Sequence, residues 1–211
     1  MSTVEPEPPH PDGGDPQRLE RQLRFLMEID QLKQVLRQSP VLDRSRREND
    51  AEHSWHIAVM ALVLAEYAEP EVSPSRAVAM LLVHDLVEID AGDTFVDDDV
   101  AVATQVEREL AAADRLFALL PPDQGRQLRA LWDEFEARET PDARFAKAMD
   151  RLQPMLVNHH TEGGTWADHG VTADRPRART ELIADSAPAL GSYAATIIDE
   201  ALRRGYLAPP A

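Results

Sequence analysis

The chain has 211 residues, of which 43% are hydrophobic, and its formal net charge is −16 at pH 7. This apolar content excludes an intrinsically disordered chain, and the acidic balance argues against non-specific nucleic-acid binding, where basic residues supply most of the affinity. Because the sequence contains no cysteine, disulfides, thiolate metal sites and a cysteine nucleophile are excluded.

The N-terminal sequence lacks the features of an export signal. It has neither a basic start nor an apolar stretch, and no apolar run in the chain reaches the ~20 residues that span a bilayer. We therefore expect a cytoplasmic protein that acts neither at a membrane nor on nucleic acid. Residues 1–17 are rich in proline, glycine and acidic residues, which predicts a disordered tail and leaves 18–211 as one domain.

Apolar residues at helical spacing predict that most of the chain is helical. The predicted helices cover 18–37, 50–67, 74–90, 97–120, 123–138, 141–158 and one or two stretches between 175 and 206. The predicted loops are 38–47 and 161–174. Asn49 or Asp50 is a suitable N-cap for the second helix, and Ser73-Pro74 is a favourable start for the third. No strand pattern of useful length is present, so the expected fold is all-α, with six to eight helices.

The stretch LLVHDLVEIDAGD, residues 81–93, places two polar groups at the end of an apolar run. His84 and Asp85 would both be costly to bury without partners, and a divalent cation suits both, since imidazole offers a lone pair and carboxylate offers charge. Adjacent residues of a helix point about 100° apart, so further ligands must come from other helices. Glu88 lies on the same helix face as this pair, and Asp93 follows in the glycine-containing turn.

Two other helices carry polar residues on an apolar face. His53 begins an apolar run, Asp150 is embedded among apolar residues, and His56 shares the broader face of His53 as a competing ligand. Each of these alone is more often a core residue than a ligand, and Asp150 has the alternative of pairing with Arg151. Together, two histidines and two carboxylates would hold one Mn, Co, Fe, Ni, Zn or Mg ion and leave positions for water and a substrate oxygen.

These residues resemble the HD-domain superfamily of metal-dependent phosphohydrolases. The ordered pattern His…His-Asp…Asp is present as His53, His84-Asp85 and Asp150. Three stretches are closer to a subgroup that includes the bacterial 5′-deoxynucleotidases, namely RRENDAEHSWH (46–56), VHDLVEIDAGD (83–93) and KAMDRLQPML (147–156). The resemblance covers 18–205 and implies an HD-type helical domain that hydrolyses the phosphomonoester of (deoxy)nucleoside 5′-monophosphates.

The resemblance also implies a role for each matching residue. The metal ligands would be His53, His84, Asp85 and Asp150. Glu88 would take part in catalysis, and Asp93 would hold or activate the attacking water. Arg37 would orient the substrate phosphate, and the turn with Asp93 and Thr94 would contact the substrate. Gln38 stands where the deoxynucleotidase has an aromatic residue, which leaves nucleoside recognition open. Members of the subgroup are commonly dimers, so a homodimer is implied.

Three alternatives remain open. A dinuclear HD protein would need further histidines between the His-Asp pair and the last Asp, and residues 86–149 contain none. A guanosine tetraphosphate hydrolase would use the same ligands, and only its substrate would separate it from a nucleotidase. A non-catalytic metal-binding protein would need neither Glu88 nor Asp93.

Overall fold

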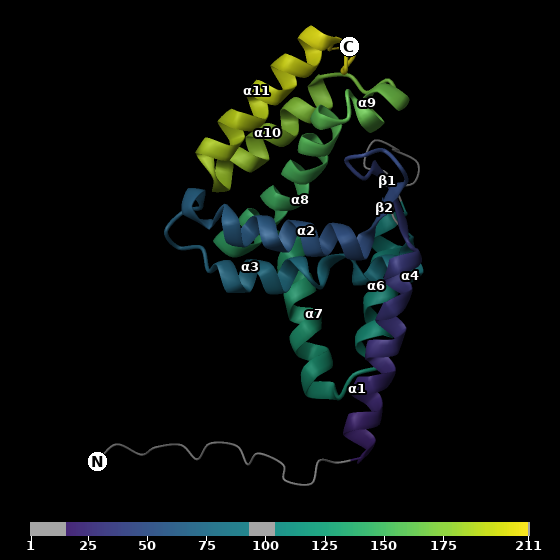
Figure 1. The fold of residues 1–211 in the computed structure, drawn as a ribbon. Coiled ribbons are helices and arrows are strands. Elements are labelled where there is room, and N and C mark those ends of the chain that lie inside the picture. Colours follow the sequence, from purple (N-terminus) through teal and green to yellow (C-terminus); the bar gives the residue numbers. More distant parts are fainter. Residues whose placement is uncertain (1–15, 93–103, 211) are drawn as a thin grey trace, which may run out of the picture.

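The computed structural model describes residues 16–92 and 104–210, and most of its regular structure is helical (Figure 1). This confirms the predicted all-α class. None of the helices in these two ranges combines the length and the apolar content that a bilayer crossing requires. Most of the predicted N-terminal tail lies outside the described residues, and the first helix begins at Pro16, two residues before the predicted domain boundary.

A shorter helix and a hairpin replace the first predicted helix. The elements are α1 (Pro16–Glu28), the 3₁₀ helix η1 (Ile29–Gln34), β1 (Leu36–Pro40) and β2 (Arg47–Asn49). The strands pair antiparallel, with Leu36 opposite Asn49. The prediction of a helix over 18–37 and a loop over 38–47 is therefore wrong in part, because strand pairing satisfies backbone groups that a longer helix would bond internally. As a result, Arg37 lies on a strand.

α2 (Asp50–Val63) carries His53 and begins with a complete capping box. The Asn49 side chain accepts a hydrogen bond from the backbone N–H of Glu52 at 3.0 Å, and the Glu52 carboxylate accepts one from the backbone N–H of Asn49 at 3.2 Å. This reciprocal pair confirms Asn49 as the N-cap and satisfies two backbone donors. The helix ends before the predicted position, and its continuation is a separate 3₁₀ helix, η2 (Ala65–Tyr67).

The predicted helix 74–90 is broken into three segments around the His-Asp pair. They are α3 (Pro74–Leu81), the 3₁₀ helix η3 (His84–Val87) and α4 (Glu88–Ala91). In a continuous helix the Leu81 carbonyl would accept from the backbone of Asp85. Here the Leu81 carbonyl accepts from Nδ1 of His84 at 2.9 Å. This side-chain bond at the break ties the His84 ring to the end of α3.

Three longer helices occupy the first part of the second described range, residues 104–210. They are α6 (Gln105–Phe117), α7 (Pro122–Ala137) and α8 (Pro141–His160). The predicted helix 97–120 begins outside the described residues, so only its later part is confirmed. α7 is followed by its C-cap Arg138, whose backbone is left-handed at φ 56°. Thr140 caps α8 by accepting a hydrogen bond from the backbone N–H of Ala143 at 3.2 Å.

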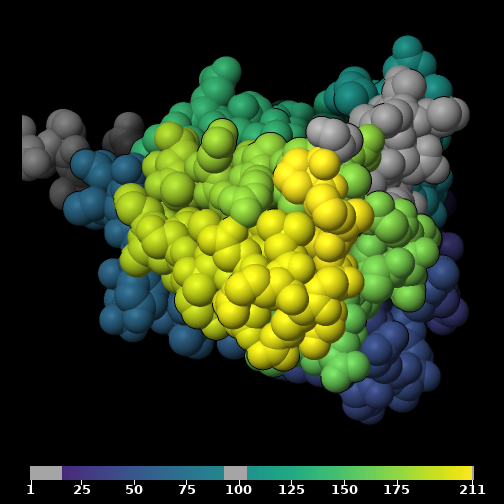
Figure 2. All heavy atoms as spheres, turned by 90° about the horizontal axis from the view of Figure 1, so that it is seen from above, coloured from purple at the N-terminus to yellow at the C-terminus, as the bar shows by residue number. Residues whose placement is uncertain are grey.

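The C-terminal helices cover one face of the molecule. They are α9 (Gly164–Asp168), α10 (Asp174–Ser186) and α11 (Pro188–Arg204). The short α9 corrects the prediction of an uninterrupted loop over 161–174. α10 and α11 pack closely, since a Cβ atom on Gly191 would lie 2.4 Å from Cβ of Ala184. Figure 2 shows these two helices forming much of the surface seen from above.

Two apolar clusters form the described core. α2 and α8 belong to the larger cluster, through residues such as Ile57 and Phe145. η3 and α6 belong to the smaller one, through Leu86 and Leu116. The two clusters approach each other where α2, η3 and α8 converge, and polar side chains are buried at this junction.

Candidate metal centre and cleft

Three predicted metal ligands from separate elements converge in the interior. His53 on α2, His84 in η3 and Asp150 on α8 each offer one ligand atom, and these atoms all lie within 4.8 Å of one another. Nε2 of His53 lies 3.2 Å from Oδ1 of Asp150, and Nε2 of His84 lies 4.0 Å from the same oxygen. All three side chains are buried. The tertiary fold therefore assembles a cluster from residues that are remote in sequence.

The His84 ring is oriented so that one nitrogen faces the cluster as an acceptor. A carbonyl oxygen can only accept, so the 2.9 Å contact with Leu81 places the ring proton on Nδ1. In the neutral ring the lone pair is then on Nε2, which is buried and makes no hydrogen bond, although it lies 2.9 Å from Oδ1 of Asp85. Burial opposes protonation of His84, but the negative charge of Asp85 outweighs it and raises the pKa of the imidazole. This nitrogen is thus placed to meet a cation.

A buried network from the hairpin and α8 surrounds His53. Its Nδ1 lies 3.7 Å from Oε2 of Glu48, and Nε2 of Gln153 donates to both oxygens of Glu48 at 3.1 and 3.3 Å. Burial, with the nearby charge of Arg37, lowers the pKa of His53 to about 4, which favours the neutral ring that a metal requires. Burial also raises the pKa of Glu48 to about 7.

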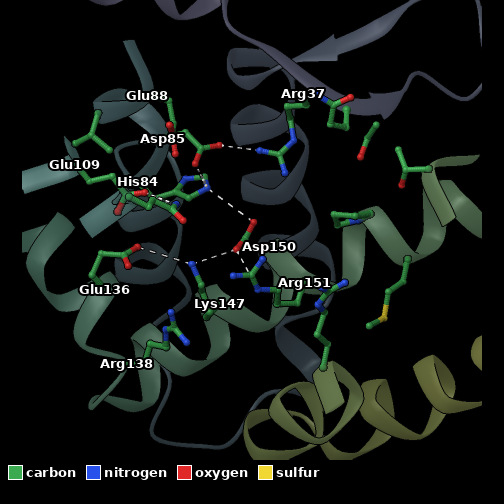
Figure 3. Close-up of a pocket in the computed structure, with 18 of the residues that line it drawn as sticks. Arg37, His84, Asp85, Glu88, Glu109, Glu136, Arg138, Lys147, Asp150 and Arg151 are labelled. Atoms are coloured by element: carbon green, nitrogen blue, oxygen red, sulfur yellow. Dashed lines mark hydrogen bonds and ion pairs between the residues drawn. The ribbon is translucent and has the colours of Figure 1, made fainter. Parts of the chain in front are cut away.

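Asp150 has cations on the side away from the histidines (Figure 3). Nζ of Lys147 lies 3.3 Å from Oδ2 of Asp150 and 3.7 Å from Oε1 of Glu136, while Nε of Arg151 lies 3.8 Å from Oδ2 of Asp150. Burial opposes ionisation, but the charges of Lys147 and then Arg151 hold the pKa of Asp150 well below its ordinary value. Asp150 is therefore a carboxylate with one oxygen beside the histidines and the other beside cations.

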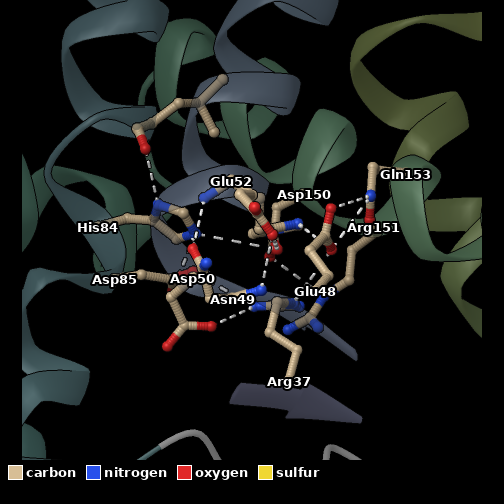
Figure 4. Close-up of polar contacts among 12 residues, drawn as sticks. Arg37, Glu48, Asn49, Asp50, Glu52, His84, Asp85, Asp150, Arg151 and Gln153 are labelled. Carbon is tan, nitrogen blue, oxygen red and sulfur yellow. Dashed lines mark hydrogen bonds and ion pairs between the residues drawn. The ribbon is translucent and has the colours of Figure 1, made fainter. Parts of the chain in front are cut away.

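Asp85 connects the cluster to the hairpin (Figure 4). Its second oxygen accepts a hydrogen bond from Nη1 of Arg37 at 3.2 Å, and the same nitrogen donates to Oδ1 of Asp50 at 3.4 Å. Burial opposes ionisation of Asp85, but the charges of His84 and Arg37 hold its pKa well below the ordinary value. Asp85 is therefore ionised beside the cluster, and its role as the fourth ligand stays a prediction.

The spacing of these atoms fits one divalent ion. Two ligand atoms that lie about 2.1 Å from one ion at right angles to each other are about 3 Å apart. The distance from His84 Nε2 to Asp85 Oδ1 is 2.9 Å, and the distance from His53 Nε2 to Asp150 Oδ1 is 3.2 Å. A set of imidazoles and carboxylates is typical of first-row transition metals and also admits Mg²⁺. The residues present therefore fit the predicted ion.

The cluster opens into a cleft with a volume of about 380 Å³. The predicted catalytic residue Glu88 is buried and lines this cleft, as do Arg37 and Gln38 from the hairpin. Trp132 and Trp166 are 4% and 3% exposed, and their side chains form an apolar part of the cleft wall. The cleft therefore combines a polar end at the cluster with aromatic surface, a combination typical of sites for small organic ligands.

Other predicted residues are not part of the cluster. Asp93 and Thr94 lie outside the described residues. His56 is half-buried on α2 but does not belong to the three-residue group, and its ring centroid lies 6.1 Å from that of the exposed Trp55. The structure thus brings His53, and not His56, beside His84 and Asp150.

Sequence reasoning missed two buried charged residues that support the cluster. Lys147 is three positions before Asp150 in an apolar helix, so the helical spacing that places both on one face was present in the sequence. Glu48 lies before the start of α2, and only the β1–β2 hairpin and α8 bring its partners Arg37 and Gln153 beside it. No local sequence pattern indicates that contact.

Comparisons with known proteins agree with this geometry. A family model described as an HD domain matches residues 29–190. The 5′-deoxynucleotidase HDDC2 of Homo sapiens is 33% identical over 135 residues, which are 64% of this chain and 65% of that protein. The protein of the same name from Bos taurus is 34% identical over 135 residues, 64% of each chain. The alignments thus span less than two thirds of these curated relatives.

A solved structure extends the similarity over most of the chain. It is described as a predicted metal-dependent phosphohydrolase from Magnetospirillum magnetotacticum MS-1, and it is 58% identical with a TM-score of 0.88. The match covers 92% of this chain and 97% of that one. A conserved hypothetical protein from Pyrococcus furiosus, 20% identical with a TM-score of 0.56 over 86% of this chain and 99% of its own, shares the fold. Since the family model covers more than half of the sequence, the chain belongs to the HD-domain family.

Proposed function

We propose that this protein is a metal-dependent phosphohydrolase that hydrolyses the phosphomonoester of (deoxy)nucleoside 5′-monophosphates. The main observation that supports this function is the buried group of His53, His84 and Asp150. This group lies at the end of a cleft that cationic side chains also line. The names of the human and bovine relatives and the description of the Magnetospirillum structure support the same reaction class. The cytoplasmic location expected from the sequence stays a prediction.

The ligand set we propose is His53, His84, Asp85 and Asp150. A divalent ion held there would supply positive charge to a phosphoryl oxygen and lower the pKa of a coordinated water. The neutral His53 and the ionised carboxylates match the protonation states that binding requires. Mn, Co, Fe, Ni, Zn and Mg remain the candidates for the ion.

The side chains around the cluster would position the phosphate and move the proton. Arg37 and Lys147 reach carboxylates of the cluster at 3.2 and 3.3 Å and so place positive charge beside the reacting phosphate. Glu88 lines the cleft and would accept the proton of the attacking water. Asp93 and Thr94 are proposed to contact the water and the substrate. Positioning and charge stabilisation are the main contributions expected for phosphoryl transfer.

A homodimer is also part of the proposal. One face of α1 exposes four apolar side chains that recur at helical spacing, with exposures between 51% and 71%: Leu19, Leu23, Leu26 and Met27. An apolar stripe of this kind on a surface helix is typical of an interface. Light scattering should give twice the chain mass, and Leu23→Glu with Met27→Glu should give the single chain. Wild-type protein that is monomeric at all concentrations would contradict this part.

The function is tested by phosphate release from a panel of deoxynucleoside and ribonucleoside monophosphates with Mn²⁺, Co²⁺ or Mg²⁺. We expect release from at least one monophosphate and none after chelation. Guanosine tetraphosphate is included, and pyrophosphate release from it in place of monophosphate hydrolysis would contradict the choice of substrate. One metal equivalent per chain is expected, whereas two would contradict the single-ion site.

A further inference from the structure

The part of the cleft beyond the cluster is lined by arginines from three different elements. Arg138 follows α7, Arg151 lies on α8 and Arg179 lies on α10. Arg151 and Lys147 are four residues apart on α8, so they lie on the same face of that helix. Figure 3 shows the Arg138 side chain extending towards Lys147. Because Glu109 and Glu136 also line this cleft, the arginines belong to a lining of mixed sign in a chain whose net charge is −16.

Arg138 differs from the cations nearest the metal ligands in how its charge is held. Arg37 and Lys147 lie 3.2 and 3.3 Å from Asp85 and Asp150, so carboxylates of the cluster already hold both. Arg151 is held more loosely, with its Nε 3.8 Å from Oδ2 of Asp150. Within 16–92 and 104–210, no carboxylate pairs with the guanidinium of Arg138. A wall residue of this kind retains its capacity to bind an anion.

The backbone of Arg138 adds an independent observation. Its φ of 56° is left-handed, a conformation in which glycine is the usual residue at a helix C-terminus. An arginine at this position costs about 1 kcal/mol relative to a relaxed backbone. The chain therefore keeps a charged side chain at the cleft wall where glycine would be the unstrained choice.

We propose that Arg138, Arg151 and Arg179 form a second anion subsite that takes a second phosphate of the nucleotide substrate. This inference rests on the proposed function, since the first phosphate is the one held at the metal cluster. A guanidinium binds a phosphate through paired charge-assisted hydrogen bonds. A phosphate is therefore a better ligand for three arginines than a neutral sugar or base. The substrate class is thus a nucleoside 3′,5′-bisphosphate, whose 5′ phosphomonoester lies at the metal cluster and whose 3′ phosphate lies at the arginines.

Equilibrium binding tests this subsite without depending on turnover. The probes are deoxyadenosine 5′-monophosphate, 5′-diphosphate and 3′,5′-bisphosphate, titrated by calorimetry into Mn²⁺-loaded protein that carries Glu88→Gln to suppress hydrolysis. The 3′,5′-bisphosphate should bind about tenfold more tightly than the monophosphate, the advantage of one additional charge-assisted contact. Tighter binding of the 5′-diphosphate than of the 3′,5′-bisphosphate would contradict the assignment of the second phosphate to the 3′ position.

Substitutions then assign that advantage to the arginines. Arg138→Ala and Arg151→Ala should each reduce the affinity ratio of two-phosphate to one-phosphate nucleotide towards one. The matched control is Arg126→Ala, an exposed arginine of α7 away from the cleft, which should keep the wild-type ratio. Equal affinities of wild-type protein for all probes, or an equal loss for mono- and two-phosphate nucleotides in Arg138→Ala, would overturn the subsite. A tenfold preference in a protein that releases no phosphate would uphold the subsite and refute the proposed reaction.

Discussion

The two ends of the cleft differ in how their charges are held. At the inner end, His53, His84 and Asp150 are buried, and the neighbouring cations are held by carboxylates. At the outer end, Arg138 is exposed and has no carboxylate partner among the described residues. The inner end is arranged to bind a fixed cation, whereas the outer end is arranged to bind an exchangeable anion. We infer that the reaction is determined at the inner end and the choice of substrate at the outer end.

The largest effect is expected from Asp150→Asn, which keeps the shape of the side chain and removes the charge between the two histidines. Binding of Mn²⁺ should be lost, and phosphate release should fall by about a thousandfold or more. Mn²⁺ at about 100 times its dissociation constant should stabilise the wild type by about 2.7 kcal/mol. The variant should gain nothing. Asp185→Asn, at an exposed position of α10, is the matched control. A variant that still binds one equivalent of Mn²⁺ would remove Asp150 from the ligand set.

Glu88→Gln tests whether the inner end contains a proton acceptor in addition to metal ligands. We expect metal binding to persist and the turnover number to fall by about 10²- to 10⁴-fold, the usual contribution of general acid–base catalysis. Glu109→Gln provides the comparison, since Glu109 also lines the cleft but has no assigned role in the reaction. Equal turnover in the wild type and Glu88→Gln would show that Glu88 does not transfer a proton.

Glu48→Gln tests the support of the cluster rather than the cluster itself. Glu48 lies 3.7 Å from Nδ1 of His53 and accepts two hydrogen bonds from Gln153, so we expect it to orient the imidazole. Loss of such an outer partner lowers metal affinity by about 10- to 100-fold. Calorimetry should show this loss, and saturating Mn²⁺ should restore most of the turnover. Glu52→Gln, at a half-buried position in the first turn of α2, should leave the metal affinity near the wild-type value. An equal loss in both variants would argue for a general disturbance.

The smallest effect is expected at the start of α2, outside both ends of the cleft. Asn49→Ala removes the side-chain acceptor of the capping box, which should lower the free energy of unfolding by about 1 kcal/mol. Urea denaturation measures this change, and Asn49→Asp should retain most of the stability because aspartate is also a good N-cap. Metal affinity should stay close to that of the wild type. A large loss of metal affinity in Asn49→Ala would mean that the cap also positions His53.

The helices that were predicted correctly have strong apolar periodicity or a clear first residue. α8 begins at Pro141 after Thr140, and α3 begins at Pro74 after Ser73, both as a cap followed by proline predicts. The errors fall where tertiary contacts override local preference. The β1–β2 hairpin depends on pairing between two short strands without alternating apolar residues, and the break after Leu81 coincides with a hydrogen bond from the His84 side chain to the Leu81 carbonyl. Neither contact is visible in a local window of sequence.

The residues of the candidate site also differ in whether the sequence could predict them. The histidines and Asp150 could be predicted because buried polar residues in apolar helices are rare and require a partner. The arginines could not, since Arg138 and Arg179 lie in polar stretches where a solvated side chain is the ordinary expectation. Only the packing of α7, α8 and α10 brings them to one wall.

The 20-residue helix α8 runs the length of this arrangement, with Asp150 at the inner end and Arg151, Met155 and Asn158 farther along the same wall. Inserting or deleting one residue before Asp150 would rotate the rest of the helix by about 100°. Metal ligand and substrate contacts would then turn away together. Because one helix carries both sets of residues, it limits how the sequence of this protein can diverge. Single replacements along the cleft wall can give new substrates. A change in helix length near Asp150 would remove binding and catalysis in one step.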